Sequence, residues 1–152
     1  ESLENLDLDI QFFGYYHKWV PQELYYHAVE HTGFKPKSQR NEGTYSKYAS
    51  FDDKIDGFHY YLAYIKFGLG RTTSDTAHEI RDGHITREEG ISLVKRFDGE
   101  FPEQYIQDCC NYMDITMQQY HDAIEKFRSP HLWHKVNGVW ELKNPIWSRV
   151  NV

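Results

Sequence analysis

The sequence predicts a mainly α-helical protein with a short strand near its N-terminus and a β-hairpin near its C-terminus. Apolar residues recur every three or four positions over Ile55–Leu69, the spacing of one helix face. Thr86–Glu89 has the Thr-x-x-Glu pattern of a helix capping box. Asn137-Gly138 is a strong signal for a two-residue hairpin turn. With 152 residues, 39% of them hydrophobic, the chain can form one domain with its own core.

The first third of the chain is expected to combine a strand, a helix and a loop. The apolar side chains within Asp9–Tyr16 predict a short strand. Pro21 suits the first turn of a helix and Gly33 suits its end, which predicts a helix over Pro21–Thr32. The polar run Phe34–Tyr48 predicts a long loop, and loops of this length inside a compact domain are often functional.

The rest of the chain carries a series of helix signals, followed by the hairpin. Ser50 is expected to cap the first of these helices, with Asp52 and Asp53 in its first turn. The later helices are predicted over Asp75–Arg81 with Ser74 as cap, Thr86–Phe97, Phe101–Tyr112, and Thr116–Phe127 with Asp114 as cap. The hairpin is predicted to pair Trp133–Val136 with Val139–Leu142.

Composition argues against two classes of partner. The net charge is −6 and no long Lys/Arg run exists, which disfavours a nucleic-acid surface. No apolar run approaches the roughly 20 residues of a membrane span. The only cysteines, Cys109 and Cys110, are adjacent and are not expected to pair, which indicates a reducing cytoplasm. The chain starts at Glu1 without a signal-peptide pattern, so we expect a cytoplasmic domain fragment.

Nine histidines raise the question of a metal site. His27-Ala-Val-Glu30-His31 fits the H-x-x-E-H pattern of some zinc peptidases, but it lies at the end of a helix, where a solvated face explains it better. His131 and His134 form an H-x-x-H pair, but in a segment that is expected to pass from loop into strand. We therefore predict no metal site.

Motifs for nucleophilic catalysis and for phosphate loops are also missing. No G-x-S-x-G pattern occurs, and the two cysteines have no histidine nearby in the sequence. Gly68-Leu-Gly70 lacks both a third glycine and a following Lys-Ser/Thr pair.

Polar groups are densest over Lys66–His84, around a glycine turn that leads into a helix. Free N–H groups at a helix N-terminus favour an anion, and Lys66 and Arg71 can clamp phosphate oxygens. Asp75, His78, Glu79 and Arg81 fall on one or two adjacent helical faces. A structural explanation is equally open, because Asp75 can support the helix dipole and Glu79 can pair with an arginine.

Seven blocks of the sequence together carry a recognisable pattern. They are Glu42–Ser50, Asp52–Tyr60, Lys66–Asp75, His78–Gly83, Ile85–Glu89, Leu93–Pro102 and Phe127–Trp133. In this order they resemble the C-terminal half of the N-acetyl sugar amidotransferases of lipopolysaccharide and surface-polysaccharide biosynthesis. The resemblance extends from about Ile10 to Trp147.

This resemblance implies an activity, cofactors and partners. The family belongs to the PP-loop ATP pyrophosphatases and acts in O-antigen and related pathways. Its members are expected to use ATP and Mg²⁺ to activate the acetamido group of a nucleotide-linked N-acetyl sugar, which ammonia then converts to an acetamidino group. A glutaminase subunit, assisted by a cyclase-like subunit, is expected to supply the ammonia.

The chain departs from the family pattern because the S-G-G-x-D-S loop and the N-terminal cysteine pair are absent. We therefore expect residues 1–16 to be a remnant of the last strand of the PP-loop domain, and residues 17–152 to be a helical C-terminal domain. The missing domain would bind ATP and Mg²⁺. The chain alone is predicted to bind no cofactor and to hydrolyse no ATP.

The resemblance also suggests roles for the polar residues. Asp75, His78 and Glu79 are the expected catalytic group, which would orient the acetamido group or move a proton. The expected substrate-binding residues are Lys66 and Arg71 for phosphate, Tyr45, Tyr60 and Tyr61 for sugar or base, and Thr72 and Arg81.

Two other functions stay open at this point. The domain can instead be a helical docking module that recruits the glutaminase and cyclase-like subunits, with tyrosines as anchors. It can also be a stability or dimerisation domain, and a homodimer through an exposed apolar face is one expected form.

Overall fold

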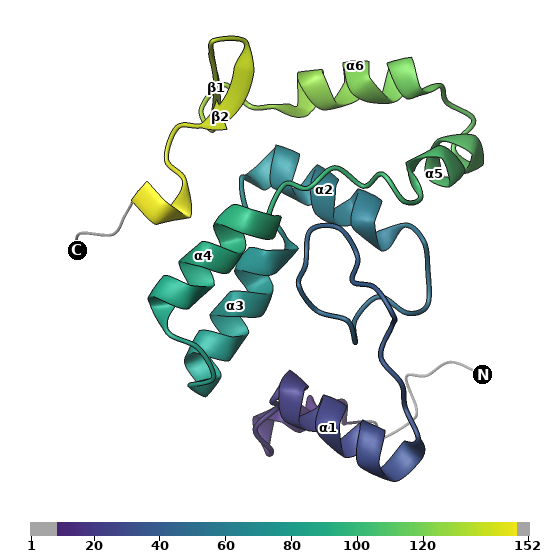
Figure 1. The fold of residues 1–152 in the computed structure, drawn as a ribbon, viewed down its shortest axis with the longest axis vertical. Helices are drawn as coiled ribbons and strands as arrows, with labels where there is room; N and C mark the ends of the chain where they lie inside the picture. The colour runs from purple at the N-terminus through teal and green to yellow at the C-terminus, as the bar shows by residue number, and fades with distance from the viewer. Residues whose placement is uncertain (1–8, 149–152) are drawn as a thin grey trace. The chain divides into compact units, whose positions relative to one another are not determined.

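The computed structural model describes residues 9–148 (Figure 1). Contacts within the chain divide it into two compact units, residues 1–35 and residues 36–152. The division falls at the start of the segment predicted to be a loop. The boundary expected after residue 16 stays a prediction.

The described residues of the first unit form a 3-10 helix over Phe13–Tyr15 and helix α1 over Pro21–Thr32. Helix α1 is confirmed at both ends: Pro21 begins it, and Gly33 ends it with a left-handed φ of 72°. The strand predicted over Asp9–Tyr16 is wrong. A strand needs a neighbour to satisfy its backbone groups, and the one sheet among the described residues belongs to the C-terminal hairpin.

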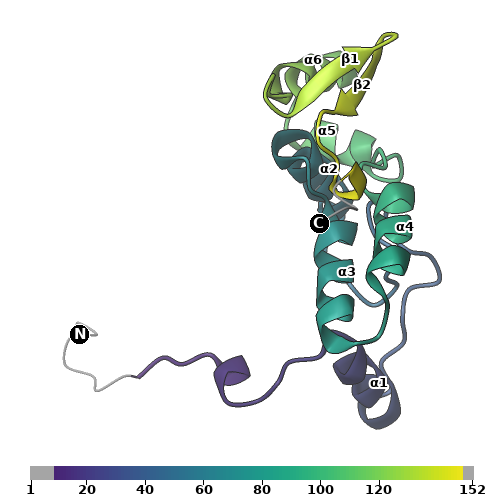
Figure 2. The same cartoon turned by 90° about the vertical axis from the view of Figure 1, so that its left-hand side faces the viewer.

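The described residues of the second unit form a loop, five α-helices, a hairpin and a short 3-10 helix. The predicted loop over Phe34–Tyr48 is confirmed, and the irregular segment extends to residue 55. Helices α3 and α4 lie side by side and antiparallel (Figures 1 and 2). Helix α2 packs against α6, and a 3-10 helix over Ile146–Ser148 follows the hairpin. The helices are α2 (Asp56–Phe67), α3 (Arg71–Asp82), α4 (Arg87–Phe97), α5 (Ile106–Tyr112) and α6 (Met117–Phe127).

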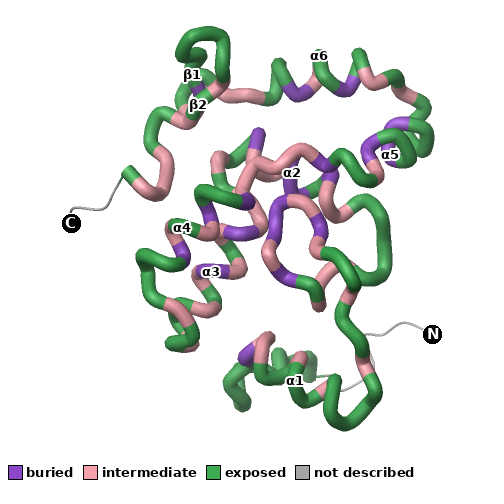
Figure 3. The backbone as a smooth tube through the Cα atoms, viewed as in Figure 1, coloured by how far each residue is buried: buried purple, intermediate pink, exposed green. Residues whose placement is uncertain are grey.

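The main apolar core of the second unit lies between α2, α5 and α6. Figure 3 shows buried positions on each of these helices. Within the predicted apolar stripe of α2, Ile65 is only 1% exposed, whereas Leu69 lies beyond the helix end and is 52% exposed. Both cysteines are buried and unpaired, as expected. The core residues are Phe58, Tyr61, Ile65, Ile106, Cys109, Cys110, Tyr120 and Ile124.

Local capping signals locate some helix starts correctly. The capping box of α4 is confirmed: Thr86 accepts from the N–H of Glu89, and the Glu89 side chain accepts from the N–H of Thr86. Helix α6 has a second capping box, formed by Thr116 with Gln119, so the predicted cap Asp114 is wrong. Asp114 instead lies in a left-handed turn with φ of 54°.

Three other helix starts differ from the prediction. Ser50 does not cap α2, because the chain continues irregularly to Ile55. Ser74 does not cap a helix, because α3 already begins at Arg71. Helix α5 begins at Ile106 rather than at Phe101, since the preceding residues form a turn whose Gln104 N–H donates to a distant Glu42 carboxylate.

The C-terminal hairpin forms with the predicted strands, β1 (Trp133–Val136) and β2 (Val139–Leu142). They pair antiparallel, with Val136 opposite Val139 across the turn. Both turn residues have positive φ, 51° at Asn137 and 84° at Gly138, as a type I′ turn requires. Trp133 anchors the hairpin to α2, since its indole N–H donates to the carbonyl of Ile65 at 2.8 Å.

None of the helices in the described part of the chain is long and apolar enough to cross a bilayer.

Candidate functional site

The loop before α2 is held against α3 by backbone and hydroxyl contacts. Gly43 adopts φ of 80°, a conformation that favours glycine, and its carbonyl accepts from both the N–H and the hydroxyl of Thr72 at 3.1 and 2.8 Å. Thr72 is fully buried. The Thr72 side chain therefore fixes the loop. This residue was predicted to bind substrate, and the structure buries it where α3 meets the loop.

A polar network connects this loop with α2 and α3. Arg71 and Asp75 are one turn apart on α3, and Nε of Arg71 donates to Oδ1 of Asp75 at 2.7 Å. The hydroxyl of Thr44 donates to Oδ2 of Asp75, also at 2.7 Å. Nη1 of Arg71 reaches the Tyr60 hydroxyl at 3.3 Å, with the guanidinium 5.2 Å from the centre of the Tyr60 ring. Because an arginine only donates, the Tyr60 oxygen accepts this bond, and the same hydroxyl also hydrogen-bonds with Oγ of Ser50.

The network keeps the Arg71 guanidinium charged and in one orientation. Burial opposes the charged form, but the neighbouring Asp75 carboxylate raises the pKa of Arg71 above its usual value. Burial raises the pKa of Tyr60, so its hydroxyl stays neutral. In the described part of the chain Nη2 of Arg71 has no hydrogen-bond partner, and the side chain is 35% exposed. One end of the guanidinium is therefore available to an anion.

Tyr45 and Glu79 form a second polar pair beside this network. The Tyr45 hydroxyl approaches the Glu79 carboxylate without reaching full hydrogen-bond geometry, and its oxygen is buried without a hydrogen-bond partner among the described residues. Burial raises the pKa of the Tyr45 hydroxyl and also that of the Glu79 carboxyl. Glu79 therefore holds a proton more readily than an exposed glutamate does.

Arg40 and Glu100 hold the other side of the loop. The two ends of the Arg40 guanidinium donate to the two Glu100 oxygens at 2.6 and 2.7 Å, a bidentate pair. Glu100 also accepts from the N–H of Gly43 at 2.9 Å. The Arg40 guanidinium lies 4.5 Å from the centre of the Phe97 ring. This pair was missed from the sequence because its members are 60 positions apart and no local motif marks either one.

The N-terminus of α3 is already occupied by a carboxylate of the chain itself. Asp98 accepts from the N–H groups of Gly70 and Thr73 at 3.0 and 3.3 Å, and from the Thr73 hydroxyl. From the sequence we expected an anionic ligand at this helix terminus, and the role of Asp98 as the acceptor there was not predicted. Lys66, the second expected phosphate ligand, is exposed, with its ammonium 5.2 Å from the centre of the Phe67 ring.

The other expected site residues are distributed as follows. Tyr45, Tyr60, Arg71, Thr72, Asp75 and Glu79 lie in or beside the network. Tyr61 belongs instead to the apolar core, and its hydroxyl accepts from Arg128 at 3.5 Å. His78 and Arg81 are exposed on α3. The roles assigned to all of these residues stay predictions.

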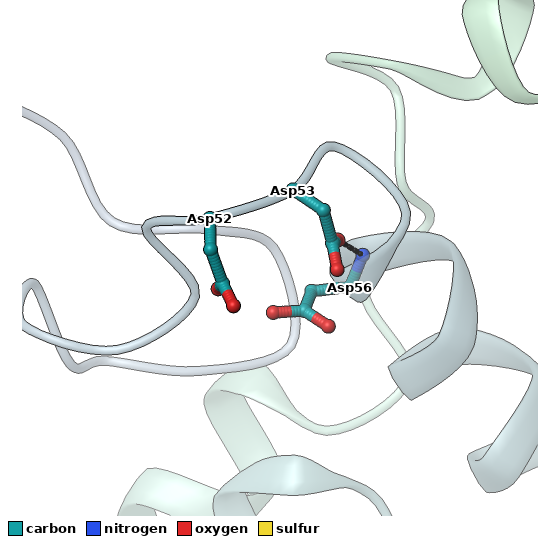
Figure 4. A group of neighbouring side chains, drawn as sticks. All are labelled: Asp52, Asp53 and Asp56. Atoms are coloured by element: carbon teal, nitrogen blue, oxygen red, sulfur yellow. Dashed lines mark hydrogen bonds between the residues drawn. The ribbon is translucent and has the colours of Figure 1, made fainter.

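The structure also bears on metal binding. The rings of His27 and His31 stack at 4.1 Å, and Nδ1 of His31 lies 3.0 Å from the carbonyl of His27. Among the described residues, only the carboxylates of Asp52, Asp53 and Asp56 bring three potential ligand atoms within 4.8 Å of one another (Figure 4). Asp53 accepts from the N–H groups of Ile55 and Asp56, which supports the start of α2. We assign no ion to these carboxylates, of which Asp52 and Asp53 are exposed.

The comparisons with known proteins give one family. A search among curated proteins finds no match. The family described as LPS biosynthesis protein WbpG-like, C-terminal domain, matches residues 42–146, well over half of the chain. The matched region contains Thr44, Tyr60, Arg71 and Asp75 of the polar network, whereas Arg40, the partner of Glu100, lies just before it. The chain therefore belongs to the WbpG-like C-terminal domain family of LPS biosynthesis proteins.

Proposed function

We propose that this domain forms part of the substrate site of an ATP-dependent amidotransferase in LPS biosynthesis. The proposed reaction converts the acetamido group of a nucleotide-linked N-acetyl sugar into an acetamidino group. Membership of an LPS biosynthesis family supports the pathway. The observation that carries the proposal is the Arg71 network, which offers a fixed and partly exposed guanidinium.

The geometry of Arg71 suits the diphosphate of a nucleotide sugar. A guanidinium presents its donors in a planar fork that matches two phosphate oxygens. Asp75 and Tyr60 fix one edge of the Arg71 guanidinium. The side chain therefore loses less conformational entropy when a ligand binds. Arg71 is therefore the proposed phosphate ligand, with the exposed Lys66 and Arg81 as outer positive charges.

The proposed chemistry requires the acetamido oxygen to become a leaving group. ATP, bound with Mg²⁺ by another domain, would supply the adenylating group. Ammonia from a glutaminase subunit and a cyclase-like subunit would then displace the activated oxygen. In this proposal the described domain holds the sugar and excludes water, so that ammonia rather than water attacks.

Two side chains in the proposed site can hold a proton during that step. Glu79 has a pKa raised by burial and lies beside the neutral Tyr45 hydroxyl. His78 is exposed on the same helix and offers an imidazole, a common proton acceptor in enzymes. The nitrogen nucleophile loses protons when the amidine forms, and either group is a proposed acceptor.

The test uses the full-length enzyme with ATP, nucleotide sugar and free ammonia, and it measures pyrophosphate release. Arg71→Ala is expected to weaken nucleotide-sugar binding by on the order of 2–4 kcal/mol, or about 30- to 1,000-fold in KM. His78→Ala is expected to lower kcat with a smaller change in KM. Arg87→Ala, an exposed arginine on α4, is the matched control.

The same experiment separates this proposal from a docking role. If both variants behave like wild type with free ammonia and lose activity only with glutamine, the domain recruits the ammonia-supplying subunits. Thermal melts of each variant identify losses that come from unfolding, because Arg71→Ala also removes a partner of Asp75.

A further inference from the structure

A groove of about 560 Å³ lies between the turn that joins α2 to α3 and the base of the C-terminal hairpin. Phe67, Leu69 and Thr73 line it on the helical side. His131, Leu142 and Asn144 line it on the hairpin side. This volume falls in the range of small-molecule sites and is much larger than the space that a single water or ion occupies.

This groove is separate from the Arg71 network. Thr73 lines the groove, whereas Arg71 points to Tyr60 and Asp75. Two successive helix positions differ by about 100°, so side chains two positions apart lie on nearly opposite sides of the helix. A ligand in the groove therefore contacts a different face of α3 from a ligand held by Arg71.

The lining indicates an uncharged ligand with flat apolar faces. No residue that lines the groove is an Asp, Glu, Lys or Arg, although 26% of the chain consists of these four types. Phe67 is 59% exposed and Leu69 is 52% exposed, so a large apolar surface faces solvent at the edge of the groove. Burying this surface against a ring system is favourable, and the aromatic face of Phe67 suits stacking.

Two polar side chains of the groove can form hydrogen bonds with the edge of such a ring. The Asn144 amide has no hydrogen-bond partner among the described residues, and it offers both a donor and an acceptor. Nδ1 of His131 contacts the Ser129 hydroxyl, which leaves Nε2 without a partner in the described part of the chain. Nucleobases combine flat apolar faces with donors and acceptors at their edge, whereas pyranose rings need more polar contacts than this groove provides.

We propose that the groove binds the uncharged base of a nucleoside, with the ring against Phe67 and its polar edge toward Asn144 and His131. The inference goes beyond the proposed function and can fail or succeed independently of it.

Saturation-transfer NMR on the full-length protein tests this, with uridine, cytidine, adenosine and guanosine as separate probes. At least one nucleoside is expected to bind the wild type through its base protons. Phe67→Ala is expected to weaken that binding by on the order of 10- to 100-fold, the usual effect of losing a stacked aromatic ring. Asn144→Ala is expected to change the preference among the four bases. Phe127→Ala removes a comparably exposed ring on α6 and is the control.

Three outcomes would overturn the proposal. One is that no nucleoside binds the wild type. Another is that a nucleoside binds equally to wild type, Phe67→Ala and Asn144→Ala, which would locate it elsewhere, for example in an ATP site. The third is that ribose alone binds as tightly as the nucleoside, since the base would then contribute nothing. Loss of pyrophosphate release in Arg71→Ala bears on the proposed function alone.

Discussion

Oδ2 of Asp75 accepts a 2.7 Å hydrogen bond from the hydroxyl of Thr44, although the two residues are 31 positions apart. The other oxygen of the same carboxylate accepts from Arg71 at 2.7 Å. One carboxylate thus fixes both the loop that carries Thr44 and the arginine that we propose as the phosphate ligand. Thr44 is 1% exposed, so no water replaces its hydroxyl without a rearrangement of the loop.

Thr44→Val tests this link with a side chain of nearly the same shape. The substitution removes the donor to Asp75 and the acceptor for the N–H of Ser46. We expect a loss of about 1–3 kcal/mol in the free energy of unfolding, because two partners are left unsatisfied in a buried region. Urea denaturation measures the loss. Thr32→Val, at an exposed position of α1, is the control and should change stability by less than about 1 kcal/mol.

Asp98→Ala tests how α3 begins. The carboxylate of Asp98 is the acceptor for the N–H groups of Gly70 and Thr73, and the helix has no side-chain cap of its own. Its removal is expected to cost about 1–3 kcal/mol and to weaken the start of the helix that carries Arg71. Hydrogen exchange at the first turn of α3 measures the local effect. Full protection of that turn in the variant would contradict this role, and Asp122→Ala on α6 is the exposed control.

How far the fold could be predicted depends on the range of the interactions involved. Helix α4 and the hairpin were predicted correctly because their signals are local, in Thr86–Glu89 and in Asn137-Gly138. The start of α3 was misplaced because its cap, Asp98, comes 28 positions after Gly70. The strand over Asp9–Tyr16 was wrong because apolar composition does not supply a strand partner.

The candidate site shows the same limit. Arg71 and Asp75 form an i,i+4 pair, which a helical segment makes visible in the sequence. Thr44 and the Arg40–Glu100 pair complete the site through contacts over 31 and 60 positions. Such contacts follow from the packing of the loop and leave no periodic pattern, so sequence inspection assigned none of these three residues.

The ionisation of Asp98 predicts a pH dependence of stability. Burial raises the pKa of the Asp98 carboxyl above its usual value of 3.8, so the folded state binds this proton more tightly than the unfolded state does. Its contribution to the free energy of unfolding is therefore largest below pH 3.8 and decreases as the pH rises through the folded-state pKa.

Asp98→Asn removes this titration and keeps one oxygen acceptor. Urea denaturation of both proteins between pH 3 and pH 7 is the measurement, and the stability difference between wild type and Asp98→Asn should shrink as the pH rises. A difference that grows with pH would mean that the hydrogen bonds from Gly70 and Thr73 outweigh the effect of burial.

Gly99 lies between Asp98, which binds the start of α3, and Glu100, which binds the loop at Gly43. Its replacement tests how closely this turn packs against its neighbours. Gly99 has φ of 80°, and a Cβ at this position would lie 2.4 Å from a carbon of the Tyr64 ring. Gly138 in the hairpin turn has nearly the same φ, 84°, but no atom lies within 4 Å of its would-be Cβ. The two glycines therefore share the backbone strain that alanine would suffer, and they differ in the collision with Tyr64.

Gly138→Ala is expected to cost about 1–2 kcal/mol, the penalty of a left-handed conformation for a residue with a Cβ. Gly99→Ala is expected to cost about 1–3 kcal/mol more, because the Tyr64 ring or the turn must move. A shift of the turn also displaces Asp98 and Glu100, which hold α3 and the Gly43 loop. Limited proteolysis should therefore cut within residues 36–55 faster in Gly99→Ala than in Gly138→Ala. Equal losses of stability with equal cleavage rates would mean that Tyr64 moves aside without cost, and that the turn does not transmit strain to the site.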